Sequence, residues 1–166
     1  MKKCMPFFIA LALFCTWSSH SAFAQSETAN SSEYTTALGL RLGWPAGVTV
    51  KHFMSPHNAL EGIVGFWYGG INITGLYEYH SPIKGVNGLQ WFIGIGADFT
   101  SWNYYGYNGA SIGIDGIIGL DYKINSVPID LSLDWKPAFY VTGVSSGLGR
   151  SPFYGTGLAL SLRYTF

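Results

Sequence analysis

From residue 34 onward the sequence is built of runs, each about ten residues long, in which bulky apolar residues alternate with small or polar ones. In the last of these runs the apolar positions are Leu158, Leu160, Leu162, Tyr164 and Phe166. Successive side chains of a β-strand point to opposite faces, so a period of two predicts strands with one apolar face. No apolar stripe with the 3.6-residue period of a capped helix accompanies this pattern. The alternation therefore predicts an all-β fold.

Turn-forming clusters of Gly, Pro, Asn and Ser divide this part of the chain into eight runs. We predict strands at residues 35–44, 48–53, 59–68, 71–80, 89–101, 110–122, 127–139 and 153–166. The longer connections between them are residues 81–88, 102–109 and 142–152. Eight consecutive strands joined in this way predict an antiparallel up-and-down β-barrel that occupies residues 34–166.

The next question is which face of the barrel points inward. Eight strands enclose an interior only just wide enough for side chains, and the apolar face here is bulky on every strand. The opposite face is small and polar and fits a narrow lumen. In the third run only Glu61 sets the register, with Ile63 on the same inner face. Charged residues make up 11% of the chain, against about 25% in soluble domains. We therefore predict a transmembrane barrel with its apolar face toward lipid.

Aromatic residues of the predicted outer face gather near the strand ends, as in the girdles of membrane barrels. One group would lie at the end away from the chain termini: Trp44, Phe66, Tyr68, Phe99 and Trp135. The other would lie at the end that holds the termini: Tyr77, Tyr79, Trp91, Tyr122, Tyr164 and Phe166. Ordinary enrichment of aromatic residues in strands is the alternative explanation.

The charged residues of the strands fall almost entirely on the predicted lumen face. We expect an ion-pair network in the lumen, formed by Arg41, Lys51, Glu61, Glu78, Asp115, Asp121, Asp130, Asp134, Lys136 and Arg163. Asp98 lies on the same face. Ion pairs would offset the cost of burying these charges, so we interpret them as a structural plug. The alternative interpretation is a path for protons or ions.

The first 24 residues have the pattern of an export signal. Lys2 and Lys3 precede a short apolar stretch, and Ala22-Phe23-Ala24 matches a cleavage site before Gln25. A retained anchor helix and a lipoprotein site at the cysteine of position 15 are alternatives. We expect residues 25–33 to form a short polar segment ahead of the barrel.

Composition limits the chemistry of the exported part. Cys4 and Cys15 both lie within the expected signal, so the mature chain has no thiol, disulfide or cysteine ligand. No metal-ligand spacing and no phosphate-binding glycine loop stands out, and we expect no cofactor. Nucleic-acid binding is not expected either, because it needs a basic patch.

Two stretches of the sequence resemble known families. The alternating Leu160, Leu162, Tyr164 and Phe166 look like the C-terminal assembly signal of bacterial outer-membrane proteins. Residues 113–123 and 127–137 are similar to a hairpin of small outer-membrane β-barrel proteins of Bacteroidetes-type bacteria, and the whole pattern resembles OmpA/OmpX-type barrels. The resemblance implies a barrel in the outer membrane of a Gram-negative-type bacterium, and we expect it to be a monomer. Its partners would be outer-membrane lipids, lipopolysaccharide and the barrel-assembly machinery.

The function that we expect is non-enzymatic: a structural, surface-interaction or envelope-integrity role without an open aqueous pore. Tyr104, Tyr105 and Tyr107 make residues 102–109 the best candidate for contacts with a surface partner or with sugars. A passage for small hydrophobic compounds is one alternative, and it would need an unfilled lumen with a lateral gap.

A lipid-modifying enzyme is the other alternative, since the lipid A deacylases and palmitoyltransferases share this architecture. Such an enzyme needs a histidine placed with a serine and a carboxylate. Ser55 is three residues beyond His52, and Ser81 directly follows His80, so that their side chains would point to opposite faces. We interpret both histidines as interfacial or turn residues.

Overall fold

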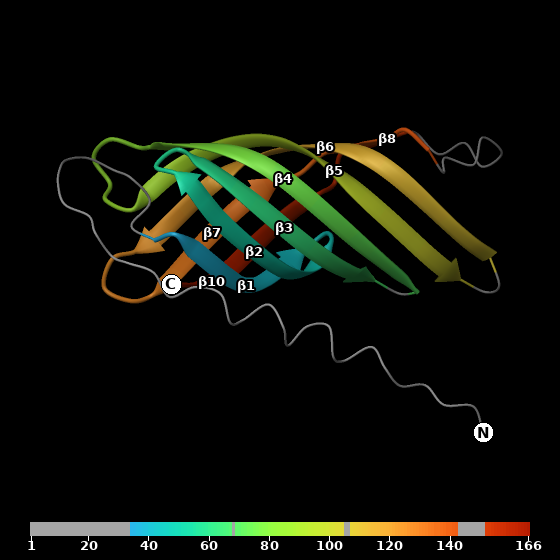
Figure 1. Ribbon diagram of the computed structural model, residues 1–166, viewed down its shortest axis with the longest axis horizontal. Coiled ribbons are helices and arrows are strands. Elements are labelled where there is room, and N and C mark those ends of the chain that lie inside the picture. The colour runs from blue at the N-terminus through green and yellow to red at the C-terminus, as the bar shows by residue number, and fades with distance from the viewer. Residues whose placement is uncertain (1–33, 68, 105–106, 143–151) are drawn as a thin grey trace, which may run out of the picture.

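Figure 1 shows the computed structural model of the protein, which describes residues 34–67, 69–104, 107–142 and 152–166. The expected signal, residues 25–33, Tyr68, Tyr105 and most of the connection 142–152 lie outside this described part. Its strands are β1 (Thr36–Gly43), β2 (Ala46–Ser55), β3 (Asn58–Trp67), β4 (Gly70–Pro82), β5 (Leu89–Tyr104), β6 (Tyr107–Ile124), β7 (Ile129–Trp135), β8 (Ala138–Tyr140), β9 (Phe153–Tyr154) and β10 (Leu158–Thr165). No helix long and apolar enough to cross a membrane occurs among the described residues.

All strand pairings are antiparallel, and the sheet closes on itself. β1 pairs with β2 on one side and with β10 on the other, from Ala37 opposite Thr165 to Gly43 opposite Ala159. β10 pairs with β7, β7 with β6, and β6 with β5, which continues through β4 and β3 to β2. β8 and β9 continue the lines of β7 and β10. The fold is thus a closed eight-stranded antiparallel barrel, and the predicted fold class is confirmed.

Burial alternates along the strands in the sense that the sequence predicts. In β4 and β10, buried and exposed residues follow each other without interruption over most of the strand. Leu160 is 46% exposed, whereas its neighbour Ser161 is fully buried. Glu61 and Ile63 of β3 are both buried, which confirms the register that rested on a single charge. The apolar face is the outer face of the barrel, and the polar face lines the lumen.

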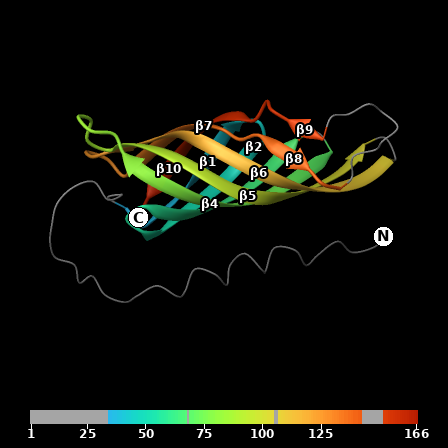
Figure 2. The same ribbon diagram turned by 90° about the horizontal axis from the view of Figure 1, so that it is seen from above.

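The connection predicted at residues 102–109 is wrong, because most of it is strand. β5 and β6 continue pairing through Trp102 opposite Gly109 and Asn103 opposite Asn108 to Tyr104 opposite Tyr107. Trp and Tyr favour strands. The Trp102 ring also covers Gly109, where a side chain would collide with it. The result is a long hairpin that reaches beyond the turn between β1 and β2, at the right of Figures 1 and 2.

The last two predicted strands are each interrupted once. Pro137 separates β7 from β8 because it has no backbone N–H to donate, yet its carbonyl accepts a bond from Gly116 at 2.9 Å. Residues 155–157 separate β9 from β10, and the register against the neighbouring strand shifts by one residue there. The barrel wall stays hydrogen-bonded across the interruption, since the backbone N–H of Lys136 donates to the carbonyl of Gly157 at 2.8 Å.

Candidate functional site

The most unusual feature of the barrel is its charged lumen. Every strand charge predicted to face inward is at most 4% exposed: Arg41, Lys51, Glu61, Glu78, Asp98, Asp115, Asp121, Asp130, Asp134, Lys136 and Arg163. Burying a charge is costly unless it is paired and hydrogen-bonded. The structure arranges these side chains as one large cluster and two smaller ones along the lumen.

The large cluster lies in the half of the barrel that holds the chain ends, and Arg163 of β10 is its centre. Its guanidinium donates to Glu61 at 2.7 Å, to Asp130 at 2.9 Å and to the Ser132 hydroxyl at 2.9 Å, and it lies 3.5 Å from Asp121. These contacts connect four strands across the lumen. Gly39 of β1 lies opposite Arg163. The two backbones approach so closely there that a Cβ on Gly39 would collide with the backbone of β10.

Lys51 of β2 is the second cation of the large cluster. Its ammonium lies 2.9 Å from Glu78, 3.3 Å from Glu61 and 3.9 Å from Asp121. Glu61 also accepts a short hydrogen bond from the Thr49 hydroxyl. Lys51 and Arg163 therefore share the carboxylates of Glu61 and Asp121. The cluster ties together the strands β2, β3, β4, β6, β7 and β10.

The two smaller clusters lie farther from the chain ends. Arg41 donates through both terminal nitrogens to the two oxygens of Asp134, each at 2.6 Å, which is the two-armed geometry of a strong arginine–carboxylate pair. Lys136 donates to Asp115 at 2.9 Å. The network predicted from the sequence is thus divided into three groups.

Apolar side chains fill the spaces around the charges. Ile63, Leu76, Phe92 and Ile117 form one buried cluster inside the barrel, and Tyr34, Ala37, Phe53 and Ala59 form another. The Lys51 ammonium lies 4.3 Å from the centre of the Phe92 ring. Such a contact stabilises a desolvated cation. Charged and apolar side chains together fill the interior.

The interpretation of His80 as an interfacial or turn residue is wrong. β4 continues beyond it to Pro82, and the even spacing from Glu78 turns its ring into the lumen, where it is fully buried. The ring stacks on Phe92 with 5.0 Å between centres, and Nε2 lies 3.0 Å from Glu78. The signal that could have found it is the alternation Glu78–His80 itself.

His52 points outward, and its ring lies 2.9 Å from the hydroxyl of Thr36. The hydrogen bonds found among the described residues bring neither His52 nor His80 to a serine hydroxyl. No group of three or more His, Cys, Asp or Glu residues that could hold a metal ion occurs in the described part of the chain.

The outer wall is apolar on every strand. One residue from each of the eight strand lines has an exposure between 44% and 63%: Leu40, Val50, Leu60, Ile73, Ile95, Ile118, Leu133 and Leu160. The girdle residues that the structure describes also point outward, and among them Tyr79 contacts Trp91 and Tyr164 contacts Phe166.

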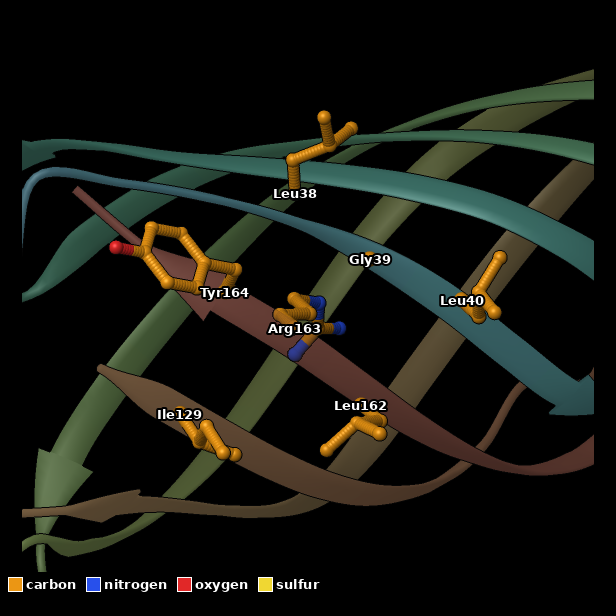
Figure 3. A pocket seen from close by; sticks show the side chains of 7 residues that line it. All are labelled: Leu38, Gly39, Leu40, Ile129, Leu162, Arg163 and Tyr164. Atoms are coloured by element: carbon orange, nitrogen blue, oxygen red, sulfur yellow. The ribbon is translucent and has the colours of Figure 1, made fainter. Parts of the chain in front are cut away.

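A shallow groove crosses this wall where β1, β10 and β7 lie side by side. Figure 3 shows the residues that line it: Leu38, Gly39 and Leu40 of β1, Ile129 of β7, and Leu162, Arg163 and Tyr164 of β10. Since the lining is almost wholly apolar, the groove suits hydrocarbon rather than a polar ligand.

Comparison with known proteins places the fold but no family. No family model matches the chain, and no curated protein matches it. Among solved structures, the chain is similar to Neisserial surface protein A with a TM-score of 0.51 and 12% sequence identity. The match covers 79% of this chain and 93% of that one. At this identity the likeness concerns the fold, and the OmpA/OmpX-type and Bacteroidetes resemblance stays a prediction.

Proposed function

We propose that the protein is an integral outer-membrane β-barrel with a structural, surface-interaction or envelope-integrity role and without an open aqueous pore. The observation that carries this proposal is the inverted distribution of side chains. Charges are buried inside the barrel, and leucine, isoleucine and valine cover its outside. Monomeric soluble proteins rarely expose apolar patches larger than a few hundred Å². A lipid bilayer is the environment that makes both faces favourable.

The interior supports the absence of a pore. Large side chains cross the lumen from several strands, and Arg163 alone contacts groups from β3, β6 and β7. An eight-stranded barrel has room for side chains but not for a water column beside them. Pairing of β1 with β10 along the full length of β1 gives little support to a lateral exit for hydrophobic compounds.

The outer membrane is the location that we propose, with lipids and lipopolysaccharide around the barrel and the assembly machinery acting on the C-terminal strand. The expected export signal at residues 1–24 supports it, as does likeness to a solved protein whose name includes "surface protein". We also propose that the protein is monomeric. We propose further that it is not a lipid-modifying enzyme, because His80 contacts carboxylates and His52 contacts a threonine hydroxyl in place of a serine.

The test is fractionation of the native cells. We expect the protein in the outer-membrane fraction, resistant to alkaline extraction and shortened by 24 residues in intact-mass analysis. Resistance to alkali follows from the apolar wall, since only insertion removes it from water. A soluble periplasmic product would refute insertion, whereas an inner-membrane product would refute only the location.

The long β5–β6 hairpin is the part that we propose to face the exterior. It lies at the opposite end of the barrel from the termini and from the turns at residues 55–58 and 124–128. Longer outer loops and shorter periplasmic turns are the rule in such barrels. Asn108 near its tip is exposed, as is His57 at the other end.

Single cysteines at these two positions test the orientation, because both native cysteines lie in the expected signal. A membrane-impermeant thiol reagent applied to whole cells should label an Asn108→Cys variant and leave a His57→Cys variant unlabelled. Both variants should react after the cells are broken, which is the control for reactivity. Labelling of the His57→Cys variant alone would show that the barrel has the opposite orientation in the membrane.

A further inference from the structure

The lumen contains more acid than base. Every acidic residue of the described chain is buried there, seven in all: Glu61, Glu78, Asp98, Asp115, Asp121, Asp130 and Asp134. The buried cations are Arg41, Lys51, Lys136 and Arg163. With His80 neutral, three carboxyl groups have no buried cation to balance them. Uncompensated buried charge is costly, and such a group takes up a proton instead.

Six of the seven acids form three pairs with one geometry. Each pair joins adjacent strands diagonally on the lumen face: Glu61 with Glu78, Asp121 with Asp130, and Asp98 with Asp115. The residue directly opposite each of these acids is a different one, such as Ala59 for Glu78, Ser132 for Asp121 and Gly113 for Asp98. Diagonal neighbours on one face are within reach of each other's side chains. The carboxyl groups within each pair lie within hydrogen-bond reach.

The hydrogen-bond pattern singles out the same six residues. Within the described part of the chain, one buried oxygen of each forms no hydrogen bond: Glu61 Oε2, Glu78 Oε1, Asp98 Oδ1, Asp115 Oδ1, Asp121 Oδ1 and Asp130 Oδ1. Two of them face a cation without such a bond, since Glu61 Oε2 lies 3.3 Å from the Lys51 ammonium and Asp121 Oδ1 lies 3.5 Å from the Arg163 guanidinium. Asp134, the unpaired acid, has both oxygens bonded to Arg41. One proton in each pair would supply an O–H donor for an otherwise unpartnered oxygen.

We infer that the folded barrel binds three protons at neutral pH, one shared within each of these carboxyl pairs. Three of the seven buried acids are then neutral, and the remaining four carboxylates balance the four buried cations. The barrel is electrically neutral inside while its acids still bridge neighbouring strands. The protons would stay bound as long as the lumen side chains stay packed, and they would be released when the barrel unfolds or when the contacts of the lumen charges open.

The surroundings of each pair fit this assignment. Lys51, Arg163, Thr49 and His80 face the Glu61–Glu78 pair, and Asp134 lies near Glu61. Asp121 shares Lys51 and His80 with this pair. Arg163, Lys51, His80, Ser132 and the Tyr34 hydroxyl face the Asp121–Asp130 pair. Lys123 lies opposite Asp130 on β6, and its ammonium donates to the backbone carbonyls of Ile124 and Val127 at the end of the barrel. Lys136, Asn72, Thr100 and Tyr140 face the Asp98–Asp115 pair. Lys51 and Arg163 together serve the four acids of the first two pairs, and Lys136 alone serves the two acids of the third. Each pair therefore has one negative charge more than its cations can balance.

The pH dependence of unfolding tests the inference on the purified protein in detergent or vesicles. Free carboxyl groups lose their protons near pH 4, so at neutral pH the folded state would bind more protons than the unfolded one. Stability must then fall as pH rises, and the folding equilibrium constant should drop about tenfold per pH unit for each proton retained. We expect this slope between pH 6 and pH 9.

Amide replacements separate the shared protons from other sources of pH dependence. Glu78→Gln, Asp98→Asn and Asp130→Asn together keep the shape of a protonated acid, so the triple variant should lose most of the slope and be the more stable protein at pH 9. Asp134→Asn, the matched control, should destabilise the barrel at every pH and leave the slope unchanged. His80→Gln should leave it unchanged as well.

Infrared spectroscopy provides a second reading that does not depend on the variants. The folded wild type at pH 8 should show the carbonyl stretch of protonated carboxyl groups, and the unfolded protein should not. A wild type without that band and without a pH slope would overturn the inference. Loss of the slope in His80→Gln alone would assign the proton to His80 and overturn it too.

Discussion

Replacing Arg163 by methionine is expected to lower the free energy of unfolding by about 3–5 kcal/mol, which would be one of the largest effects of any single substitution in this barrel. Arg163 is 1% exposed, and its guanidinium contacts Glu61, Asp121 and Asp130. Methionine fills much of the same space but leaves these carboxylates without their cation. Urea titration of the protein in lipid vesicles measures the change.

Two further variants show whether the loss comes from charge. Lys84→Met removes a cation that is exposed in the connection between β4 and β5, and it should leave stability close to that of the wild type. Adding Glu61→Gln and Asp130→Asn to Arg163→Met should recover part of the loss, because two of the three acids that contact Arg163 are then replaced by neutral amides. An Arg163→Met barrel as stable as the wild type would show that the lumen ion pairs do not hold the strands together.

Replacing Leu160 by arginine is expected to cost about 2–4 kcal/mol in a bilayer, since Leu160 lies near the middle of β10 on the outer face. The penalty comes from moving a cation into hydrocarbon, so it should be absent or much reduced in detergent micelles, where the long side chain can reach water. Refolding titrations into vesicles and micelles compare the two.

Leu160→Ala is the matched control for this substitution. It removes the same packing without adding charge, and it should cost much less than Leu160→Arg. If the arginine variant inserts into vesicles as readily as the alanine variant, the outer face of β10 does not contact lipid.

The strands and their register could be predicted because both are local properties of the sequence. A period of two assigns each residue to a face, and the bulk of the apolar face decides which face is outside. This reasoning placed Arg41, Glu61 and Asp134 in the lumen without knowledge of the barrel. It failed at the β5–β6 hairpin, where the pairing of Trp102 with Gly109 extends strands through residues that read as a loop.

The pairing of the lumen charges could not be predicted in the same way. Which cation meets which acid depends on the stagger between strands that are distant in sequence, such as Arg163 of β10 and Glu61 of β3. His80 was missed for a related reason, since its burial depends on β4 continuing beyond it into Pro82. The diagonal carboxyl pairs depend on register between neighbours, which the sequence leaves open by one or two residues.

Insertion of the barrel with its apolar face in lipid is the central claim, and a spin-label scan of β10 tests it most directly. Single labels at consecutive positions from Leu158 to Thr165, in protein reconstituted into vesicles, report access to oxygen dissolved in the bilayer and to a water-soluble paramagnetic reagent. We expect high oxygen access with a period of two, with maxima at Leu158, Leu160, Leu162 and Tyr164, and little access of the water-soluble reagent at those positions. Access of the water-soluble reagent to these same four positions would contradict insertion with this face in lipid.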